Sequence, residues 1–169
     1  MSDFYQTGVV ATFHRLGRPD SGKIESELTW YSNERPIALV LPSLYSELGG
    51  DALKGIVREL KGVKYVREIV VTLGPAAAAE FRKAREFFSD LPQKTRIIWN
   101  TGPGLTRIYD AIEAAGLPIG EQGKGRSAWM AYGYILSQQE FHVIALHDCD
   151  IVTYNREMLA RLCYPVTNP

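Results

Sequence analysis

Residues 37–41 read IALVL, and this short run decides the fold class of the chain. All five side chains are apolar, and a proline stands on each side of the run, at Pro36 and Pro42. A run of this length without a polar position is typical of a strand that is buried on both faces, as in a parallel sheet. We therefore expect a sheet that is covered by helices on both sides.

Strand-like and helix-like segments alternate on the C-terminal side of this run. Further strands are predicted at EIVVTL (68–73), TRIIWN (95–100) and FHVIALH (141–147). Helical periodicity is found between these strands, at residues 51–63, 75–91, 104–116 and 123–139. This alternation predicts an α/β fold with a mostly parallel sheet flanked by helices. In such folds a ligand binds at the carboxyl ends of the strands.

The segment before the first strand has a different pattern. Its apolar side chains recur at loosely helical spacing, at Phe4, Val9, Phe13 and Leu16. A turn is favoured at residues 17–22 and a second short helix at residues 24–33. We predict a helical N-terminal arm over residues 1–35, followed by the sheet-containing part over residues 36–169.

Composition limits the classes of partner. The 169 residues are 46% hydrophobic and 22% charged, which is ordinary for one globular domain. Lys plus Arg equals Asp plus Glu, at 19 each, so no global charge favours nucleic acid or an anionic membrane. No apolar run approaches the roughly 20 residues of a membrane span, and the N-terminus lacks a secretory pattern. The two cysteines, Cys149 and Cys163, form no spaced metal-binding pair, and we expect a reducing cytoplasm.

Two carboxylates follow the last predicted strand, in the sequence HDCD (147–150). Beyond the end of a strand, Asp148 and Asp150 can both turn toward one site. Neighbouring carboxylates repel each other, so a cation is expected beside them, and oxygen ligands favour Mg²⁺ or Mn²⁺. The pair therefore predicts a clamp for a metal and a diphosphate. In the alternative interpretation, one aspartate caps a turn and the other is solvated.

A second alternative is a phosphatase of the haloacid-dehalogenase type, whose nucleophile motif VIALHDCDIV (143–152) resembles. In that case Asp148 would be the nucleophile and Asp150 the general acid and base. That motif normally opens a chain, and a lysine and a further acidic pair follow far downstream. Here residues 151–169 contain no lysine, and Glu157 is their one acidic residue.

A second motif that indicates a ligand site, besides the two acids, is Gly123-Lys124-Gly125. It precedes a helix that is expected to begin near Ser127. Glycines allow close approach of a ligand, lysine supplies a charge for phosphate, and a helix N-terminus adds N–H donors. The segment is not a Walker loop, and by itself it fits a plain loop as well. It precedes the two acids by one helix and one strand, so both can reach the same sheet edge. Together they predict a nucleotide-diphosphate site, with Arg126 and Asn100 as weaker candidates.

Three segments resemble the glucosyl-3-phosphoglycerate synthases, which are retaining glycosyltransferases of the GT-A fold related to mannosylglycerate-type synthases. The segments are LPSLYSEL, GKGRSAWMAYGYIL and ALHDCDIVTYNREMLARL, and the resemblance covers residues 36–169. It implies a Rossmann-like GT-A fold and transfer of glucose from UDP-glucose to the hydroxyl of 3-phosphoglycerate, with Mg²⁺ or Mn²⁺. The product is a precursor of the compatible solute glucosylglycerate.

The resemblance also implies roles for the residues of the first strand end. In the family, a segment similar to Pro-Ala-Leu-Asn-Glu-Glu lines the uridine. The positions of this chain that match it are Pro42, Ser43, Leu44 and Glu47. Tyr45 and Ser46 depart from the pattern. Thr72-Leu73-Gly74 stands where such enzymes often have Asp-Ser-Gly, so GDP-mannose or another nucleotide sugar stays open as the donor.

At the diphosphate, Gly123 and Lys124 match the family's Gly-Lys-Gly, Asp148 matches the acid near the ribose and metal, and Asp150 matches the direct metal ligand. Retention in this family implies no obvious enzyme nucleophile, so no catalytic residue is assigned. The family's acceptor-binding residues and a further metal-ligand histidine lie beyond residue 169. We expect the nucleotide-sugar-binding half of a longer enzyme, or else a non-catalytic nucleotide-sugar-binding domain. Related enzymes suggest a homodimer, although the sequence carries no interface signature.

Overall fold

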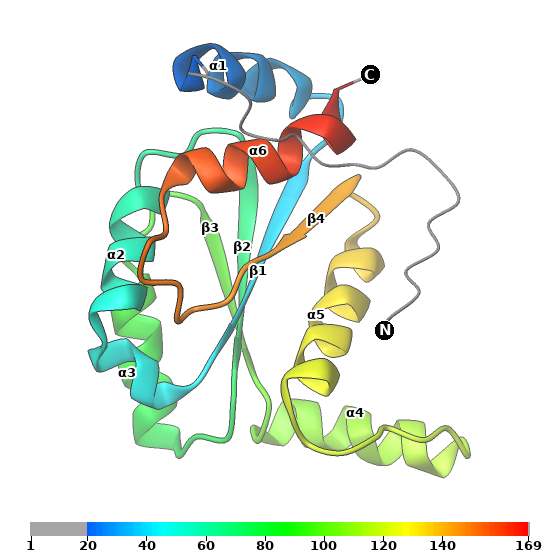
Figure 1. Cartoon of the computed structure of the whole chain (residues 1–169). Coiled ribbons are helices and arrows are strands. Elements are labelled where there is room, and N and C mark those ends of the chain that lie inside the picture. Colours follow the sequence, from blue (N-terminus) through cyan, green and yellow to red (C-terminus); the bar gives the residue numbers. More distant parts are fainter. Residues whose placement is uncertain (1–19, 169) are drawn as a thin grey trace, which may run out of the picture.

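The predicted strands form one parallel sheet in the computed structural model, which describes residues 20–168 (Figure 1). The strands are β1 (Ile37–Ser43), β2 (Val66–Leu73), β3 (Lys94–Trp99) and β4 (Val143–Leu146). The helices are α1 (Ser21–Tyr31), α2 (Asp51–Leu60), α3 (Ala78–Phe88), α4 (Pro103–Ala114), α5 (Lys124–Gln138) and α6 (Arg156–Thr167). A short 3₁₀ helix, η1 (Tyr45–Gly49), follows β1.

The strand order of the sheet is β3-β2-β1-β4, and every neighbouring pair is parallel. The chain therefore adds β2 and β3 on one side of β1 and then returns to add β4 on the other side. Such a reversal of strand order opens a crevice at the carboxyl ends of the strands. The predicted α/β class with a parallel sheet is confirmed, and the arrangement is consistent with a Rossmann-like GT-A fold.

Residues 37–41 of strand β1 are all apolar, and the strand is covered on both faces. Ile37, Leu39 and Leu41 pack into a core that also takes in side chains of α1, α2 and α6. Ala38 and Val40 point to the opposite face, where they pack with side chains of α5. All five are fully buried. The alternation of side chains along a strand thus divides one apolar run between two cores.

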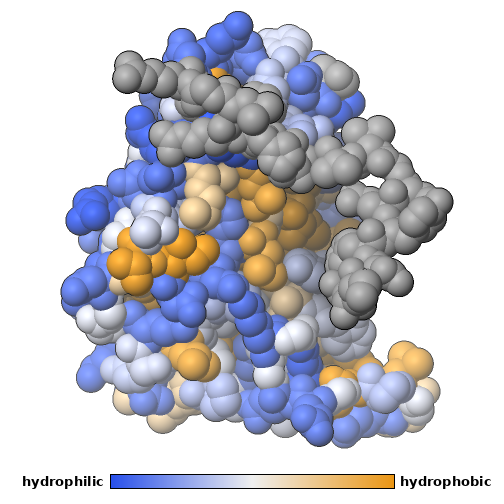
Figure 2. All heavy atoms as spheres, viewed as in Figure 1, coloured by the Kyte–Doolittle hydropathy of each residue, from blue (hydrophilic) through white to orange (hydrophobic). Residues whose placement is uncertain are grey.

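Strand β4 lies at one edge of this sheet, with β1 as its neighbour. Figure 2 shows hydrophilic side chains over most of the face viewed in Figure 1, and hydrophobic side chains gathered in the region of β4. None of the helices within residues 20–168 combines the length and the apolar character needed to cross a membrane.

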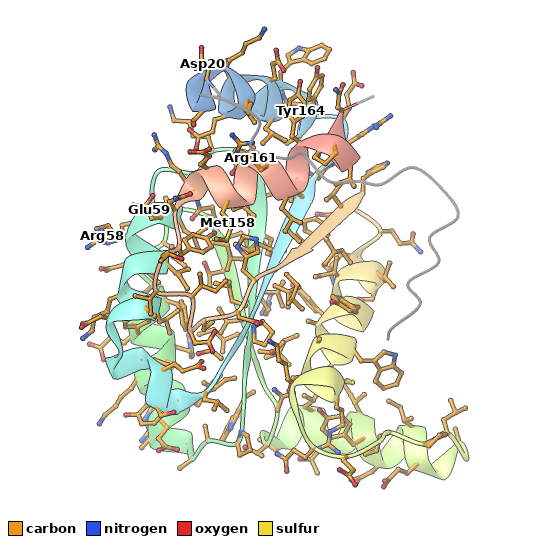
Figure 3. All side chains as sticks on the ribbon, in the orientation of Figure 1. Asp20, Arg58, Glu59, Met158, Arg161 and Tyr164 are labelled. Atoms are coloured by element: carbon orange, nitrogen blue, oxygen red, sulfur yellow. The ribbon has the colours of Figure 1, made fainter. Side chains whose placement is uncertain are left out.

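The described part of the N-terminal arm is helix α1, which packs on α6 (Figure 1). The predicted helix at 24–33 is therefore present, although it begins at Ser21, because the Asp20 side chain accepts a hydrogen bond from the Lys23 N–H at 3.1 Å. Tyr164 extends from α6 toward α1 (Figure 3) and its hydroxyl donates to the Glu27 carboxylate. Residues 1–19 lie outside the described residues, and so does the first predicted helical segment.

Helix α6 is not predicted from the sequence. The Asn155 side chain caps it by accepting a hydrogen bond from the Met158 N–H at 3.0 Å. Leu159 and Cys163 lie on the buried face of the helix. Pro165 lies inside the helix near its C-terminal end, where proline normally argues against helix. The capping asparagine and the spacing of the apolar residues are the signals that could have identified it.

Replacing Gly133 with alanine should stabilise the fold. Gly133 lies in the middle of α5, and a Cβ at this position would meet no atom within 4 Å. Alanine loses less backbone entropy than glycine in a helix, so we expect the free energy of unfolding to rise by about 0.5–1 kcal/mol. Urea unfolding followed by circular dichroism measures this change.

Gly102→Ala is the matched contrast, because its Cβ would lie 2.7 Å from ring carbons of Trp99. This variant should lower the unfolding free energy. A lower stability for Gly133→Ala as well would contradict the packing described here for α5.

Candidate functional site

A pocket of about 320 Å³ lies at the carboxyl ends of the strands, where the strand order reverses. In Figure 1 the ends of β1, β2 and β3 and the beginning of α5 all lie toward the lower part of the view. The pocket is lined by every residue that the sequence predicts for the site: Pro42, Ser43, Leu44, Glu47, Gly123, Lys124, Asp148 and Asp150. Three distant segments are thus brought together. Their roles as ligands stay predictions.

The two acids reach the pocket because the residue between them packs inward. Strand β4 ends at Leu146, and Cys149 is 2% exposed and belongs to the core beneath α2 and α6. Burial raises the pKa of the Cys149 thiol to about 12, and the Glu47 carboxylate adds to this rise. Cys149 is therefore a neutral core residue at the floor of the pocket, which it lines together with Asp148 and Asp150.

Lys124 occupies the first turn of α5, which begins three residues before the predicted start near Ser127. The earlier start has a local cause, because the backbone N–H and the hydroxyl of Ser127 both donate to the Gly123 carbonyl, at 3.1 and 2.9 Å. The Lys124 ammonium forms an ion pair with the Asp148 carboxylate. The lysine, predicted to share one sheet edge with the acid pair, thus contacts Asp148 directly.

The carboxylates also define what the site offers a metal ion. Asp148 and Asp150 supply two carboxylates at one pocket, which is typical of Mg²⁺ sites that share the ion with substrate phosphates. Within residues 20–168, no group of three or more His, Cys, Asp or Glu side chains could hold a metal by itself. The donor set therefore fits an ion completed by phosphate and water, and does not fit a closed structural site. In this structure Lys124 supplies the positive charge beside Asp148.

The end of β1 is fixed by contacts that hold its backbone. Glu47, in η1, accepts a hydrogen bond from the Leu44 N–H at 2.8 Å. The Gly74 N–H donates to the Ser43 carbonyl at 2.8 Å. A Cβ on Gly74 would lie 2.7 Å from a methyl carbon of Leu44, so the Leu44 side chain packs closely over this glycine. Glu47 and Gly74 thus position the Pro42–Leu44 segment along one wall of the pocket.

Several residues of this pocket were missed or given little weight in the sequence analysis. They are Thr72, Gly74, Pro75, Asn100, Gln122, Arg126 and Ser127. Thr72 and Asn100 come from the ends of β2 and β3, and both are buried. The signal that could have found them is their place at the carboxyl ends of predicted parallel strands.

His147, next to the acids, is a core residue. Its backbone N–H donates to the Val40 carbonyl at 3.1 Å and continues the β1–β4 pairing. Its ring packs edge-on against Tyr154 with 5.2 Å between ring centroids. Burial lowers the pKa of His147, and the Asp148 carboxylate only partly opposes this effect. The imidazole is therefore neutral at neutral pH.

A larger hollow of about 900 Å³ lies between α4 and α5. Its walls are mainly apolar, and it contains Trp99, Trp129 and Ile108. It is lined by no carboxylate and by none of the residues that the sequence predicts for the site. The smaller pocket therefore remains the candidate functional site.

Comparison with known proteins identifies two relatives, and both are glucosyl-3-phosphoglycerate synthases. The chain is 44% identical over 169 residues to glucosyl-3-phosphoglycerate synthase of Persephonella marina, and 30% identical over 165 residues to the synthase of Methanococcoides burtonii. These matches cover 100% and 97% of the chain but 42% and 40% of the relatives, so the chain spans about two fifths of their length. No protein-family model matches the sequence. The family resemblance of the sequence motifs is confirmed by these relatives.

Both cysteines should be inert in the folded protein. Burial raises the pKa of Cys149 and of Cys163 to about 12, so both thiols are protonated at pH 8. Because the thiolate is the reactive form, we expect iodoacetamide to leave the native protein unmodified at pH 8 and to alkylate both thiols in guanidinium chloride. Mass spectrometry counts the adducts. Rapid alkylation of native Cys149 would show that the thiol is open to the pocket.

Proposed function

We propose that this chain binds the nucleotide-sugar donor of a metal-dependent glycosyltransferase, which transfers glucose from UDP-glucose to 3-phosphoglycerate with retention. The observation that carries the proposal is the meeting of Lys124, Asp148 and Asp150 in one pocket at the reversal of strand order. This is where a doubly wound sheet binds a nucleotide. The likeness to two glucosyl-3-phosphoglycerate synthases supports the choice of sugar and acceptor.

The residues of the pocket suit a diphosphate that leaves with negative charge. Lys124 and the free N–H groups of the first turn of α5 can bind phosphate oxygens, and they stabilise charge that develops on the leaving nucleotide. A Mg²⁺ or Mn²⁺ ion held by Asp148 and Asp150 would neutralise further phosphate charge. A bound diphosphate would give Lys124 a new anionic partner, and Asp148 could then hold the metal.

The nucleoside part of the donor fits the opposite wall of the pocket. The segment Pro42–Leu44 carries backbone groups at the pocket, and Leu44 is 52% exposed there. Glu47 holds this segment through the Leu44 N–H. We propose uridine as the base that contacts it, with GDP-mannose as the alternative donor.

The other two interpretations make different predictions for the same pocket. A phosphatase of the haloacid-dehalogenase type would release phosphate from an aryl phosphate and lose this activity in Asp148→Asn. The position of the acid pair, after the last strand of the sheet and not the first, and the names of the relatives both disfavour it. A non-catalytic domain would bind the nucleotide sugar as proposed and differ only in turnover.

Asp150→Ala should abolish the metal dependence of nucleotide binding. We expect calorimetry to show that Mg²⁺ or Mn²⁺ tightens the binding of UDP to the unaltered chain. In the variant the metal should give no tightening, because one of two protein carboxylates is lost. Asp110→Ala is the control, since Asp110 is an exposed carboxylate of α4 that does not line the pocket.

UDP binding by the unaltered chain that does not respond to either metal would refute metal dependence. Equal metal responses of the unaltered chain and of Asp150→Ala would instead remove Asp150 from the site.

Lys124→Met should separate phosphate binding from metal binding. The variant loses a charge-assisted contact to phosphate, so we expect UDP to bind about tenfold or more weakly. Uridine, which has no phosphate, should bind as before. Mg²⁺ alone should bind no more weakly, because Asp148 no longer has Lys124 as its ion-pair partner. A parallel loss of uridine and UDP binding would mean that Lys124 shapes the pocket and does not contact phosphate.

A further inference from the structure

The pocket contains a second cation, Arg126, whose charge is not balanced in the way that the charge of Lys124 is. Both residues lie in the first turn of α5 and line the same pocket. Lys124 is paired with Asp148, whereas no carboxylate within residues 20–168 forms an ion pair with Arg126. The guanidinium donates to the Gly120 carbonyl at 3.3 Å. With five N–H donors, it has others free for a ligand.

The guanidinium of Arg126 is held in place by an aromatic ring. Its central carbon lies 4.7 Å from the centroid of the Tyr109 ring, in the geometry of a cation–π contact. Tyr109 is the one residue of α4 that is buried. Burial raises the pKa of Tyr109, and the nearby Arg126 only partly opposes this, so the ring stays neutral at physiological pH.

The Tyr109 ring is in turn tied to the sheet. Its hydroxyl donates to the Asn100 side-chain oxygen at 3.3 Å, and the Asn100 amide donates to the Leu73 carbonyl at 2.8 Å. Asn100 is 4% exposed, and it follows β3, while Leu73 ends β2. The contacts from Leu73 through Asn100 and Tyr109 to Arg126 therefore fix the guanidinium before any ligand arrives. Such preorganisation lowers the entropic cost of binding.

We propose that Arg126 is a second phosphate-binding residue of this pocket and contacts the pyrophosphate of the nucleotide sugar beside Lys124. The inference rests on the proposed function. A planar guanidinium with several free donors recognises two phosphate oxygens at once, which a lysine cannot do. Side chains two residues apart do not share a helix face, but Lys124 and Arg126 both line this pocket, so one diphosphate in it can contact both. Asn100 and Tyr109 act as positioning residues for it.

The test compares uridine, UDP and 3-phosphoglycerate as ligands of the chain by calorimetry in the presence of Mg²⁺. We expect Arg126→Gln to bind UDP about tenfold or more weakly and uridine as before. Arg126→Lys should be intermediate, because it keeps the charge and loses the planar donor set. Arg107→Gln is the control, since Arg107 is an exposed arginine of α4 that does not line this pocket. Tyr109→Phe keeps the ring and loses the bond to Asn100, and should weaken UDP binding less than Arg126→Gln.

The outcomes distinguish this inference from the function on which it rests. If the unaltered chain binds UDP no better than uridine, the proposed function fails and the inference fails with it. If the unaltered chain prefers UDP and Arg126→Gln keeps the full preference, the inference alone is overturned. If Arg126→Gln weakens the binding of 3-phosphoglycerate and leaves UDP unchanged, Arg126 serves the phosphate of the acceptor, and its assignment to the donor is wrong.

Discussion

The constraint on which the structure depends is the burial of strand β1 on both of its faces. One face of β1 packs against α2 and α6, and the other face packs against α5. These helices come from different parts of the chain. To place a neighbour on the second side of β1, the chain must reverse the direction in which strands are added. The crossover through α5 to β4 therefore completes the burial of β1. It also separates the loops at the carboxyl end of β1, where the candidate site lies.

The positive and negative charges of the pocket nearly cancel without a ligand. Asp148 and Asp150 bring two negative charges, and Lys124 and Arg126 bring two positive charges, while the third carboxylate of the pocket, Glu47, accepts a hydrogen bond from the Leu44 N–H. Only one ion pair, Lys124 with Asp148, forms among these four within the described residues. The remaining cation and the remaining carboxylate can each take a partner of opposite sign. A ligand that combines phosphate with a divalent cation supplies both partners at once.

Hydrogen bonds between the strand ends hold the walls of the pocket. Glu47 holds the end of β1, the Gly74 N–H joins the ends of β1 and β2, and Asn100 joins the end of β2 to α4 through Tyr109. None of these bonds uses Lys124, Arg126, Asp148 or Asp150. The protein thus separates the residues that build the pocket from the residues that are proposed to contact phosphate and metal.

The strands, most helices and the candidate site segments could be predicted from local sequence patterns, because burial and helical faces leave a periodic pattern in residues such as 37–41. Local patterns did not predict α6, where Pro165 obscures them, or the true start of α5, which depends on hydrogen bonds to Gly123. Only the tertiary structure decided the order of the strands and the contacts of Lys124 with Asp148 and of Arg126 with Tyr109. These contacts join residues far apart in the chain, and their partners are chosen by packing that no local pattern records.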